Sequence, residues 1–364
     1  MKRCLRFAPL VLQPLCASAF RRFCAVLWLA ILSQALTSCI KGDNATDTKR
    51  NNFEALWTLM DEHYCFFDYK QQQIGLDWNA IHSKYAPQVK EEMTSQQLFE
   101  VMANMLAELR DGHVNLGAAF DYARNWSYFE DYPQNYNDSI VQTTYLGTDY
   151  HIASGLSYRM LDDNIGYIRV PSFATGIGHG NVSVALKELQ LASGLIIDVR
   201  SNGGGEVTNA HTLAAHFINE KTLIGYTSHK TGKGHADFSS PKPEYLEPSS
   251  DGIRWQKPCI VLTNRQCYSA TNDFVKCMKT SPLVTVMGDQ TGGGSGMPFT
   301  SELPNGWSVR YSAVIYYDPQ MQHTEFGIPP DIPLQMSGSD TRQRRDTYIE
   351  KAREYLRGRD LVLR

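Results

Sequence analysis

Residues 195–205 have the sequence LIIDVRSNGGG, a short apolar run that leads into three consecutive glycines. The apolar part, Leu195–Val199, has the length of a buried strand, and a helical pattern follows the glycines. Because glycine has no side chain, the backbone N–H groups of such a strand-to-helix turn are open to a ligand. A phosphate-binding loop would continue with Gly-Lys-Ser or Gly-Lys-Thr, which is absent here. The turn therefore predicts either a tight structural corner or a ligand site of another kind.

Similar apolar runs recur through the second half of the chain, separated by helical patterns. They do not alternate apolar with polar residues, as a strand with one solvated face would. Buried strands that alternate with helices are typical of an α/β layer fold, which we expect over residues 155–364, with a helix at the C-terminus. The predicted strands are Ile165–Val170, Leu195–Val199, Cys259–Leu262, Val284–Met287 and Trp307–Tyr317, and the predicted helices between them are Val184–Leu191, Val207–Ile218 and Ala270–Met278.

The first 38 residues have the pattern of a targeting signal. Arg21–Arg22 precede ten apolar residues, 23–32, a length that suits a signal peptide and is too short to cross a bilayer. The run leads to Leu36–Cys39, which has the pattern of a bacterial lipobox; a chance cysteine after an apolar leader is the alternative. We expect residues 1–38 to be removed and Cys39 to be acylated, which would hold a lipoprotein in the cell envelope, at the outer membrane or facing the periplasm.

Composition and charge exclude several classes of function. The chain has 364 residues, 42% of them apolar, which is globular composition. Residues 1–38 hold five of the 35 basic residues and none of the 38 acidic ones, so the remainder has 30 basic and 38 acidic residues, a net charge of −8. Such a charge argues against nucleic acid as a partner. No cysteine or histidine spacing indicates a metal site, and we expect no cofactor.

The region before the α/β pattern divides into three parts. Residues 39–50 are polar and aperiodic and predict a tether. Residues 51–116 have helical periodicity and predict a small helical domain. Its clearest helix spans Thr94–Leu109, where Thr94 and Gln97 have the spacing of a capping box, and Gly112 suits a left-handed cap after it.

Two other segments carry weaker signals. Residues 117–154 form an aromatic insert without an assignable pattern. Residues 226–256 are polar and predict a long loop over the edge of the sheet.

Two residues stand at positions where chemistry is possible. Ser269 follows the predicted strand that ends at Leu262 and opens a helix, so its hydroxyl would be raised out of the sheet at a helix N-terminus, which favours developing negative charge. A serine at such a position is usually only an N-cap. His113 follows the end of the Thr94–Leu109 helix, where a histidine is more often a surface or capping residue.

In their order along the chain, these segments resemble the tail-specific, or carboxyl-terminal processing, family of serine peptidases, in the branch near tricorn protease and the interphotoreceptor retinoid-binding modules. The resemblance covers roughly residues 50–340 and implies a crotonase-like α/β catalytic domain that acts on unstructured polypeptides. The motifs that carry it are RDGH at 110–113, IGYIRV at 165–170, DVRSNGGG at 198–205, Asn264 with Ser269-Ala270, GDQTGGG at 288–294 and EFGIPPD at 325–331.

The resemblance also implies roles for individual residues. Ser269 matches the nucleophile, His113 the base that takes its proton, and Glu325 the acid that orients the histidine. Other members of the family use a lysine about 25 residues after the serine, but residues 280–364 contain one lysine, Lys351 in the C-terminal helix, so a Ser–Lys dyad is not expected. The expected oxyanion donors are the backbone N–H groups of Gly203 or Gly204 and of Ala270.

Alternatives remain on the same fold. The retinoid-binding relatives bind apolar ligands without proteolysis, so a non-catalytic module that binds hydrophobic ligands is one alternative, and a hydrolase of non-peptide esters is another. The family's substrate-tail (PDZ) domain takes some 80–90 residues, whereas about 50 separate His113 from Ile165. We therefore expect no complete PDZ domain.

Overall fold

The computed structural model describes residues 47–362. The predicted signal peptide and Cys39 lie outside the described residues. Within residues 47–362, no helix is both long enough and apolar enough to cross a bilayer.

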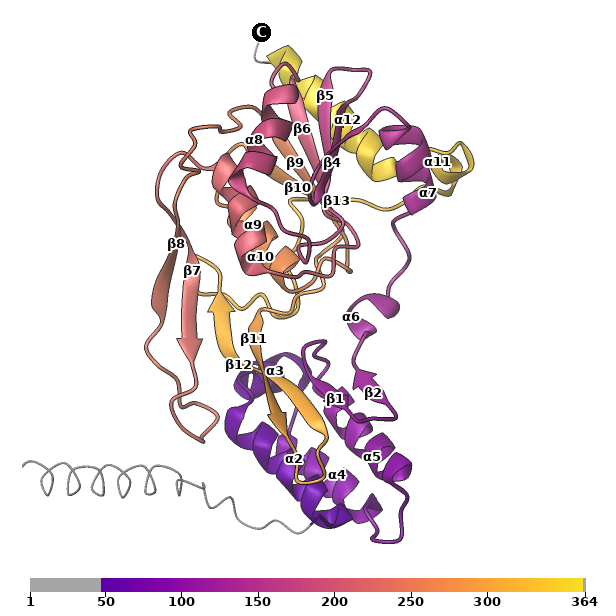
Figure 1. The fold of residues 1–364 in the computed structure, drawn as a ribbon, viewed down its shortest axis with the longest axis vertical. Helices are drawn as coiled ribbons and strands as arrows, with labels where there is room; N and C mark the ends of the chain where they lie inside the picture. Colours follow the sequence, from indigo (N-terminus) through magenta and orange to yellow (C-terminus); the bar gives the residue numbers. More distant parts are fainter. Residues whose placement is uncertain (1–46, 363–364) are drawn as a thin grey trace, which may run out of the picture. The chain divides into compact units, whose positions relative to one another are not determined.

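A seven-stranded sheet forms the centre of the α/β region (Figure 1). Its strand order is β13-β10-β9-β6-β5-β4-β3, and the pairs from β13 to β5 are parallel while β4 and β3 are antiparallel. Four of the five predicted strands, β5, β6, β9 and β10, belong to this sheet, with ends that differ from the prediction by at most one residue. The fifth, predicted at Trp307–Tyr317, forms a strand but belongs to the second sheet. The strands β3, β4 and β13 are not among the predicted ones. The bounds are β3 (His151–Ala153), β4 (Leu156–Met160), β5 (Ile165–Arg169), β6 (Gly194–Asp198), β9 (Cys259–Thr263), β10 (Val284–Gly288) and β13 (Ile332–Pro333). Since β3 starts before residue 155, the sheet begins inside the predicted insert.

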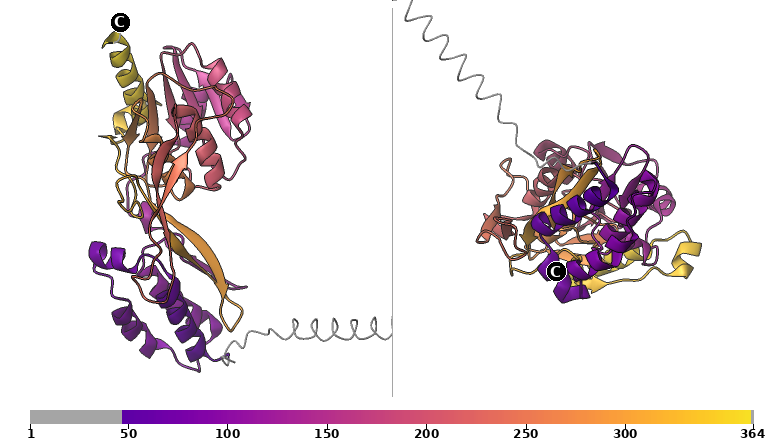
Figure 2. Two further views of the ribbon diagram at one scale, coloured as in Figure 1. Left: turned by 90° about the vertical axis from the view of Figure 1, so that its left-hand side faces the viewer. Right: turned by 90° about the horizontal axis from the view of Figure 1, so that it is seen from below.

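Helices cover both faces of this sheet, as the left view of Figure 2 shows. On β6, Leu195 and Ile197 pack into one hydrophobic cluster with the helices α8, α9 and α10, while Ile196 points to the other face and packs against α12. Burial on both faces explains why the strand sequences do not alternate. The helix bounds are α8 (His179–Glu188), α9 (Val207–Ala214, continued by a 3₁₀ turn at Ala215–Phe217), α10 (Ala270–Met278), α11 (Gly338–Arg342) and α12 (Thr347–Val362).

A second sheet corrects the prediction of a loop at 226–256. Two strands, β7 (Thr222–His229) and β8 (Lys242–Leu246), pair antiparallel in this region. On its other side, β7 pairs antiparallel with β12 (Ser308–Tyr317). The β8 strand is polar and largely exposed, so its residues carry little hydrophobic signal. The long strand β12 also pairs with β11 (Gly296–Glu302) and with the short strand β1 (Asn115–Gly117), which in turn pairs with β2 (Tyr122–Arg124).

The N-terminal helices pack on this second sheet. Their hydrophobic cluster includes Val309, Tyr311 and Ile315 from β12. The core of the helical region is therefore completed by a strand that begins 201 residues after the end of α5, since 308 − 107 = 201. The predicted capping box of Thr94 and Gln97 is confirmed. The helices are α2 (Lys49–His63), α3 (Phe67–Ile74), α4 (Trp78–Tyr85) and α5 (Ser95–Ala107). Because α2 starts at residue 49, the tether predicted to reach residue 50 ends earlier.

The aromatic insert runs from the second sheet to the large one. After β2 it forms α6 (Ser127–Glu130), α7 (Asp138–Ile140) and a π-helical turn at Val141–Leu146. Tyr128 of α6 stacks on Tyr268 with 4.2 Å between the ring centroids. The sequence predicts Gly112 as the left-handed residue after α5. In the structure that residue is Arg110 (φ 47°), so this prediction is wrong. Gly112 instead leaves room for the two stacked rings, since a Cβ there would lie 2.9 Å from Tyr128.

Candidate active site

Ser269 occupies a strained corner between β9 and α10. Its φ of 58° and ψ of −122° lie outside the regions that a residue with a side chain ordinarily adopts. The N–H of Ser269 donates to the carbonyl oxygen of Gly293 (2.9 Å). Although Ser269 is the N-cap residue of α10, its hydroxyl accepts no capping hydrogen bond, in contrast to Ser337 at the start of α11. A simple capping role therefore does not account for this serine.

The structure brings His113 to Ser269 from 156 residues away in the sequence. The Nε2 atom of His113 lies 3.0 Å from the Oγ of Ser269, which is hydrogen-bond distance. The imidazole is 3% exposed and packs edge-on against the ring of Tyr268. Burial lowers the pKa of His113 to about 4, with the negative charge of Asp111 opposing the shift. At neutral pH the ring is therefore uncharged and able to accept the serine proton.

The triple-glycine turn approaches Ser269 closely. A Cβ on Gly204 would lie 2.7 Å from the carbonyl oxygen of Tyr268 and 2.9 Å from the Cβ of Ser269, so only glycine fits. Asn202 holds the turn: its Oδ1 accepts from the N–H of Gly204 (2.9 Å) and its Nδ2 donates to the carbonyl of Val170 (3.1 Å).

This arrangement corrects one expected oxyanion donor. The Gly204 N–H is already bonded to Asn202 and is not open to a ligand. The N–H of Ala270 is at the first position of α10, where no carbonyl of the helix can accept it. The N–H groups of Ala270 and Gly203 remain the candidates from the predicted set.

A buried arginine, Arg200, fixes the start of the glycine turn. The Nε and Nη2 atoms of Arg200 donate to both carboxylate oxygens of Asp198 (2.9 and 2.6 Å). Its Nη1 donates to both oxygens of Asp346 at the start of α12 (3.0 Å each). All three side chains are fully buried. The network therefore connects the end of β6, from which the glycine turn continues, to the start of α12.

Glu325 lies in the same buried region, but within the described part of the chain it forms no hydrogen bond or ion pair with His113. Its Oε2 accepts from the N–H of Ser295 (2.9 Å), and its Oε1 lies 3.3 Å from the Nζ of Lys70. The Nδ1 of His113, which the orienting acid of a triad would bond, has no hydrogen-bond partner among the described residues. The structure thus places Glu325 beside a lysine and not directly on the histidine.

Lys70 and Asp111 complete a charged cluster that the sequence did not indicate. The Nζ of Lys70, on α3, lies 3.8 Å from Asp111 Oδ2 and donates to the carbonyl of Leu109 (2.7 Å). Asp111 accepts the backbone N–H of His113 at its Oδ1 (2.7 Å) and the hydroxyl of Tyr64 at its Oδ2 (2.7 Å). The spacing of an aspartate two residues before the histidine is the one signal that could have assigned Asp111 a role.

The two carboxyl groups of this cluster titrate differently. Burial would raise the pKa of Asp111, but the charge of Lys70 and the hydrogen bonds that Asp111 accepts from Tyr64 and from the N–H of His113 lower that pKa. Burial and the negative charge of Asp111 raise the pKa of Glu325 to about 8. At neutral pH, Asp111 therefore carries the negative charge nearest to the histidine and Glu325 holds its proton.

A pocket of about 360 Å³ opens beside the nucleophile. Its lining includes Ser269 and Ala270, together with Gly205 from the glycine turn. The apolar side chains of Val207 and Met297 also line the pocket.

Comparison with protein families places these features in a known group. The model of peptidase family S41 matches residues 164–334, and the model of the tricorn protease C1 domain matches residues 45–107. A carboxyl-terminal-processing protease of Synechocystis sp. is 26% identical over 183 residues, which are 50% of this chain and 40% of that protein. The carboxy-terminal processing protease CtpA of Bacillus subtilis is 26% identical over 180 residues, 49% of this chain and 36% of that protein. The match thus spans about two fifths of the length of these relatives.

Solved structures extend the similarity to nearly the whole described chain. A putative peptidase from Parabacteroides merdae is 51% identical, with a TM-score of 0.81 over 85% of this chain and 97% of that one. Mature CPAF in complex with lactacystin has the same fold, with a TM-score of 0.64 at 12% identity over 85% of this chain and 97% of that one.

The lowered pKa of His113 predicts an acid limit for the reactivity of Ser269. The rate at which a fluorophosphonate probe modifies Ser269 should stay constant down to about pH 5 and fall as pH decreases through about 4, because the protonated ring accepts no proton. The measurement is the labelling rate across pH 3–8, with folding followed by circular dichroism. A midpoint near 6.5, the ordinary value for histidine, would contradict the buried environment described here.

Proposed function

This chain belongs to the S41 family of serine peptidases, and we propose that it is an endopeptidase that cuts unstructured polypeptides through an acyl-enzyme on Ser269. The observation that carries the proposal is the 3.0 Å approach of His113 Nε2 to Ser269 Oγ. A serine hydroxyl at its ordinary pKa becomes nucleophilic only with a base at this distance. We further propose that the large sheet and its helices form the crotonase-like domain of the family.

The proposed reaction follows from the geometry of the site. His113 takes the proton of Ser269 as the oxygen attacks the peptide carbonyl, and later gives it to the leaving amine. The oxyanion forms near the N-terminus of α10, where the N–H of Ala270 and the helix dipole stabilise it, with Gly203 as the second donor. Removing one such donor typically costs about 3 kcal/mol of transition-state stabilisation.

We propose Glu325 as a positioning residue that acts on His113 through Lys70 and Asp111. Lys70 forms an ion pair with Asp111 and lies 3.3 Å from Glu325 Oε1, and Asp111 accepts the backbone N–H of His113. The fixed negative charge of Asp111 stabilises the imidazolium that forms during the reaction. Ionisation of Glu325 adds a second negative charge to the same buried cluster.

Replacing the nucleophile tests the proposed enzyme directly. Wild-type protein should react with a fluorophosphonate probe and hydrolyse casein, and Ser269→Ala should do neither. Ser337→Ala is the matched control, since Ser337 is also an N-cap serine, and it should keep full activity with only a small loss of stability. Full labelling of Ser269→Ala would reject Ser269 as nucleophile. Absence of labelling in the folded wild-type protein would favour a non-catalytic binding module.

The role of Glu325 predicts a change at alkaline pH. Its carboxyl is neutral below and ionised above about pH 8, so kcat should rise a few-fold as pH passes through 8, because the added negative charge favours the imidazolium. Glu325→Gln cannot ionise and should lack this rise while KM stays near the wild-type value. The pH profile of kcat between 6 and 10 checks this. An unchanged alkaline rise in Glu325→Gln would remove Glu325 from the mechanism.

We also propose that Cys39 is acylated and anchors the protein to the cell envelope through its lipid. The support is the apolar leader and the lipobox pattern at residues 36–39. Bacterial cells fed an alkyne-labelled fatty acid should incorporate it into the wild-type chain, which should fractionate with membranes. Cys39→Ala should lose the label and leave the membrane fraction. Equal labelling of both proteins would contradict an anchor at this residue.

A further inference from the structure

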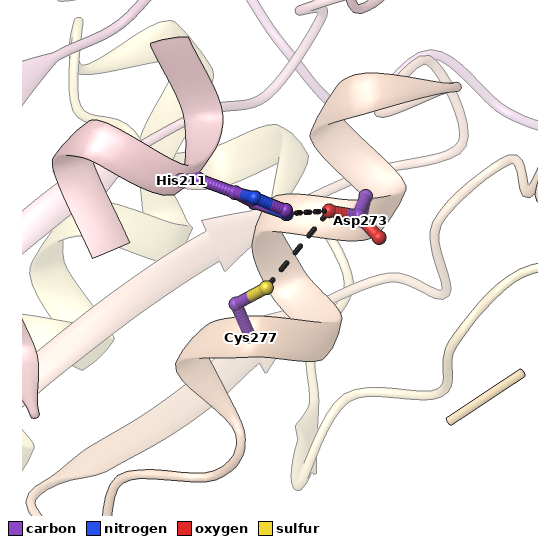
Figure 3. Close-up of side chains that lie close together, drawn as sticks. All are labelled: His211, Asp273 and Cys277. Carbon is purple, nitrogen blue, oxygen red and sulfur yellow. Dashed lines mark hydrogen bonds and ion pairs between the residues drawn. The ribbon is translucent and has the colours of Figure 1, made fainter. Parts of the chain in front are cut away.

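Three potential metal ligands meet between α9 and α10, close to the candidate nucleophile. Figure 3 shows His211 on α9 facing Asp273 and Cys277, which stand one helical turn apart on α10. One ligand atom from each residue lies within 4.8 Å of the other two. The Nε2 of His211 is 2.6 Å from Asp273 Oδ2, and the Sγ of Cys277 is 3.9 Å from the same oxygen.

The spacing of these atoms is near that of a tetrahedral metal site. Zinc binds nitrogen and oxygen at about 2.0–2.2 Å and sulfur at about 2.3 Å, so its ligands stand roughly 3.3–3.8 Å from one another. Small rotations of His211 and Cys277 would bring the three atoms to these separations. The other oxygen of Asp273, Oδ1, is held by the Nζ of Lys276 (2.6 Å), which fixes the carboxylate with Oδ2 toward the other two ligands. Such an outer contact orients ligands in metal sites.

The ligand types of His211, Asp273 and Cys277 determine which cations the three residues favour. A thiolate and an imidazole together favour zinc and similar borderline cations over magnesium or calcium, which prefer oxygen. Cys277 is 1% exposed, so its thiol is shielded from bulk water. His211 and Asp273 are partly exposed, which leaves a path for an ion to enter.

We infer that His211, Asp273 and Cys277 form a site for a divalent zinc-type cation, with the fourth position open to water from the pocket. His211 and Asp273 line the same pocket as Ser269. The N–H of Asp273 donates to the carbonyl of Ser269 (3.0 Å), so the site is one helical turn from the nucleophile. A cation held there occupies the wall of the pocket and blocks access to Ser269, which makes the site inhibitory.

The inhibitory part of this inference rests on the proposed function, whereas the binding part does not. Sequence spacing gave no sign of the site, because His211 and Asp273 are 62 residues apart and meet only through the packing of α9 on α10.

Cobalt substitution tests binding without reference to activity. The reduced full-length protein, titrated with Co²⁺, should develop the sulfur-to-cobalt charge-transfer band and the visible bands of four-coordinate cobalt, and Zn²⁺ should displace them. Cys277→Ser should lose this spectrum, and His211→Gln should bind at least tenfold more weakly. Cys259→Ser is the matched control, because Cys259 is also a buried free cysteine but lies on β9, and it should match wild type. Each variant is checked for folding by thermal denaturation.

The result that would overturn the site is the same cobalt spectrum and stoichiometry in Cys277→Ser as in wild type, or no such spectrum in the wild-type protein. The second measurement is the rate of fluorophosphonate labelling of Ser269 with and without Zn²⁺. Zinc should slow labelling at least tenfold in wild type and in Cys259→Ser, but not in Cys277→Ser. Equal slowing in Cys277→Ser would overturn the inhibitory role. If Ser269 reacts in no variant, the proposed function fails while the cobalt result still decides the metal site.

Discussion

The close packing of backbone around Ser269 is the constraint on which the site depends. Ser269 has a positive φ, a conformation that costs on the order of 1–3 kcal/mol and persists only where surrounding structure enforces it. Here the N–H bond to Gly293 holds the residue on one side, and Gly204 lies against it on the other. Neither neighbour tolerates a Cβ, since Gly293 lies against the carbonyl of Glu325 and Gly204 against that of Tyr268. The hydroxyl is thereby turned away from a capping position and toward His113.

Electrostatics behind the histidine come from two parts of the fold that are far apart in sequence. Lys70 lies on α3 of the N-terminal helices, while Glu325 lies in the segment after β12. Both are buried and lie 3.3 Å apart, so each gives the other a polar partner in a region that excludes water. The packing of the N-terminal helices on β12 therefore places Lys70 beside Glu325 and is not only a support for the chain.

The aromatic insert, residues 117–154, also contributes packing around the candidate site. Tyr128 stacks on Tyr268, whose ring also packs against His113, and Gly112 makes room for that stack. The insert thus packs on Tyr268, the ring that contacts the buried His113, whose pKa burial lowers. No local pattern in residues 117–154 predicts this, because the contacts are made by isolated rings and not by an element with regular periodicity.

The sequence alone determined the four neighbouring parallel strands β5, β6, β9 and β10 of the large sheet, since burial on both faces leaves uninterrupted apolar runs. Its motifs also indicated Ser269, His113 and the glycine turn as candidate site residues. The sequence did not predict the strand β8, which is polar and lies at a sheet edge. Nor did it predict that the N–H of Gly204 is bonded to Asn202. The contacts of Lys70 with Leu109 and of His211 with Asp273 were not predicted either, because the partners are 39 and 62 residues apart in the sequence. Local order follows from short-range periodicity, whereas the pairing of buried charges and ligands is decided only when distant elements pack and exclude water.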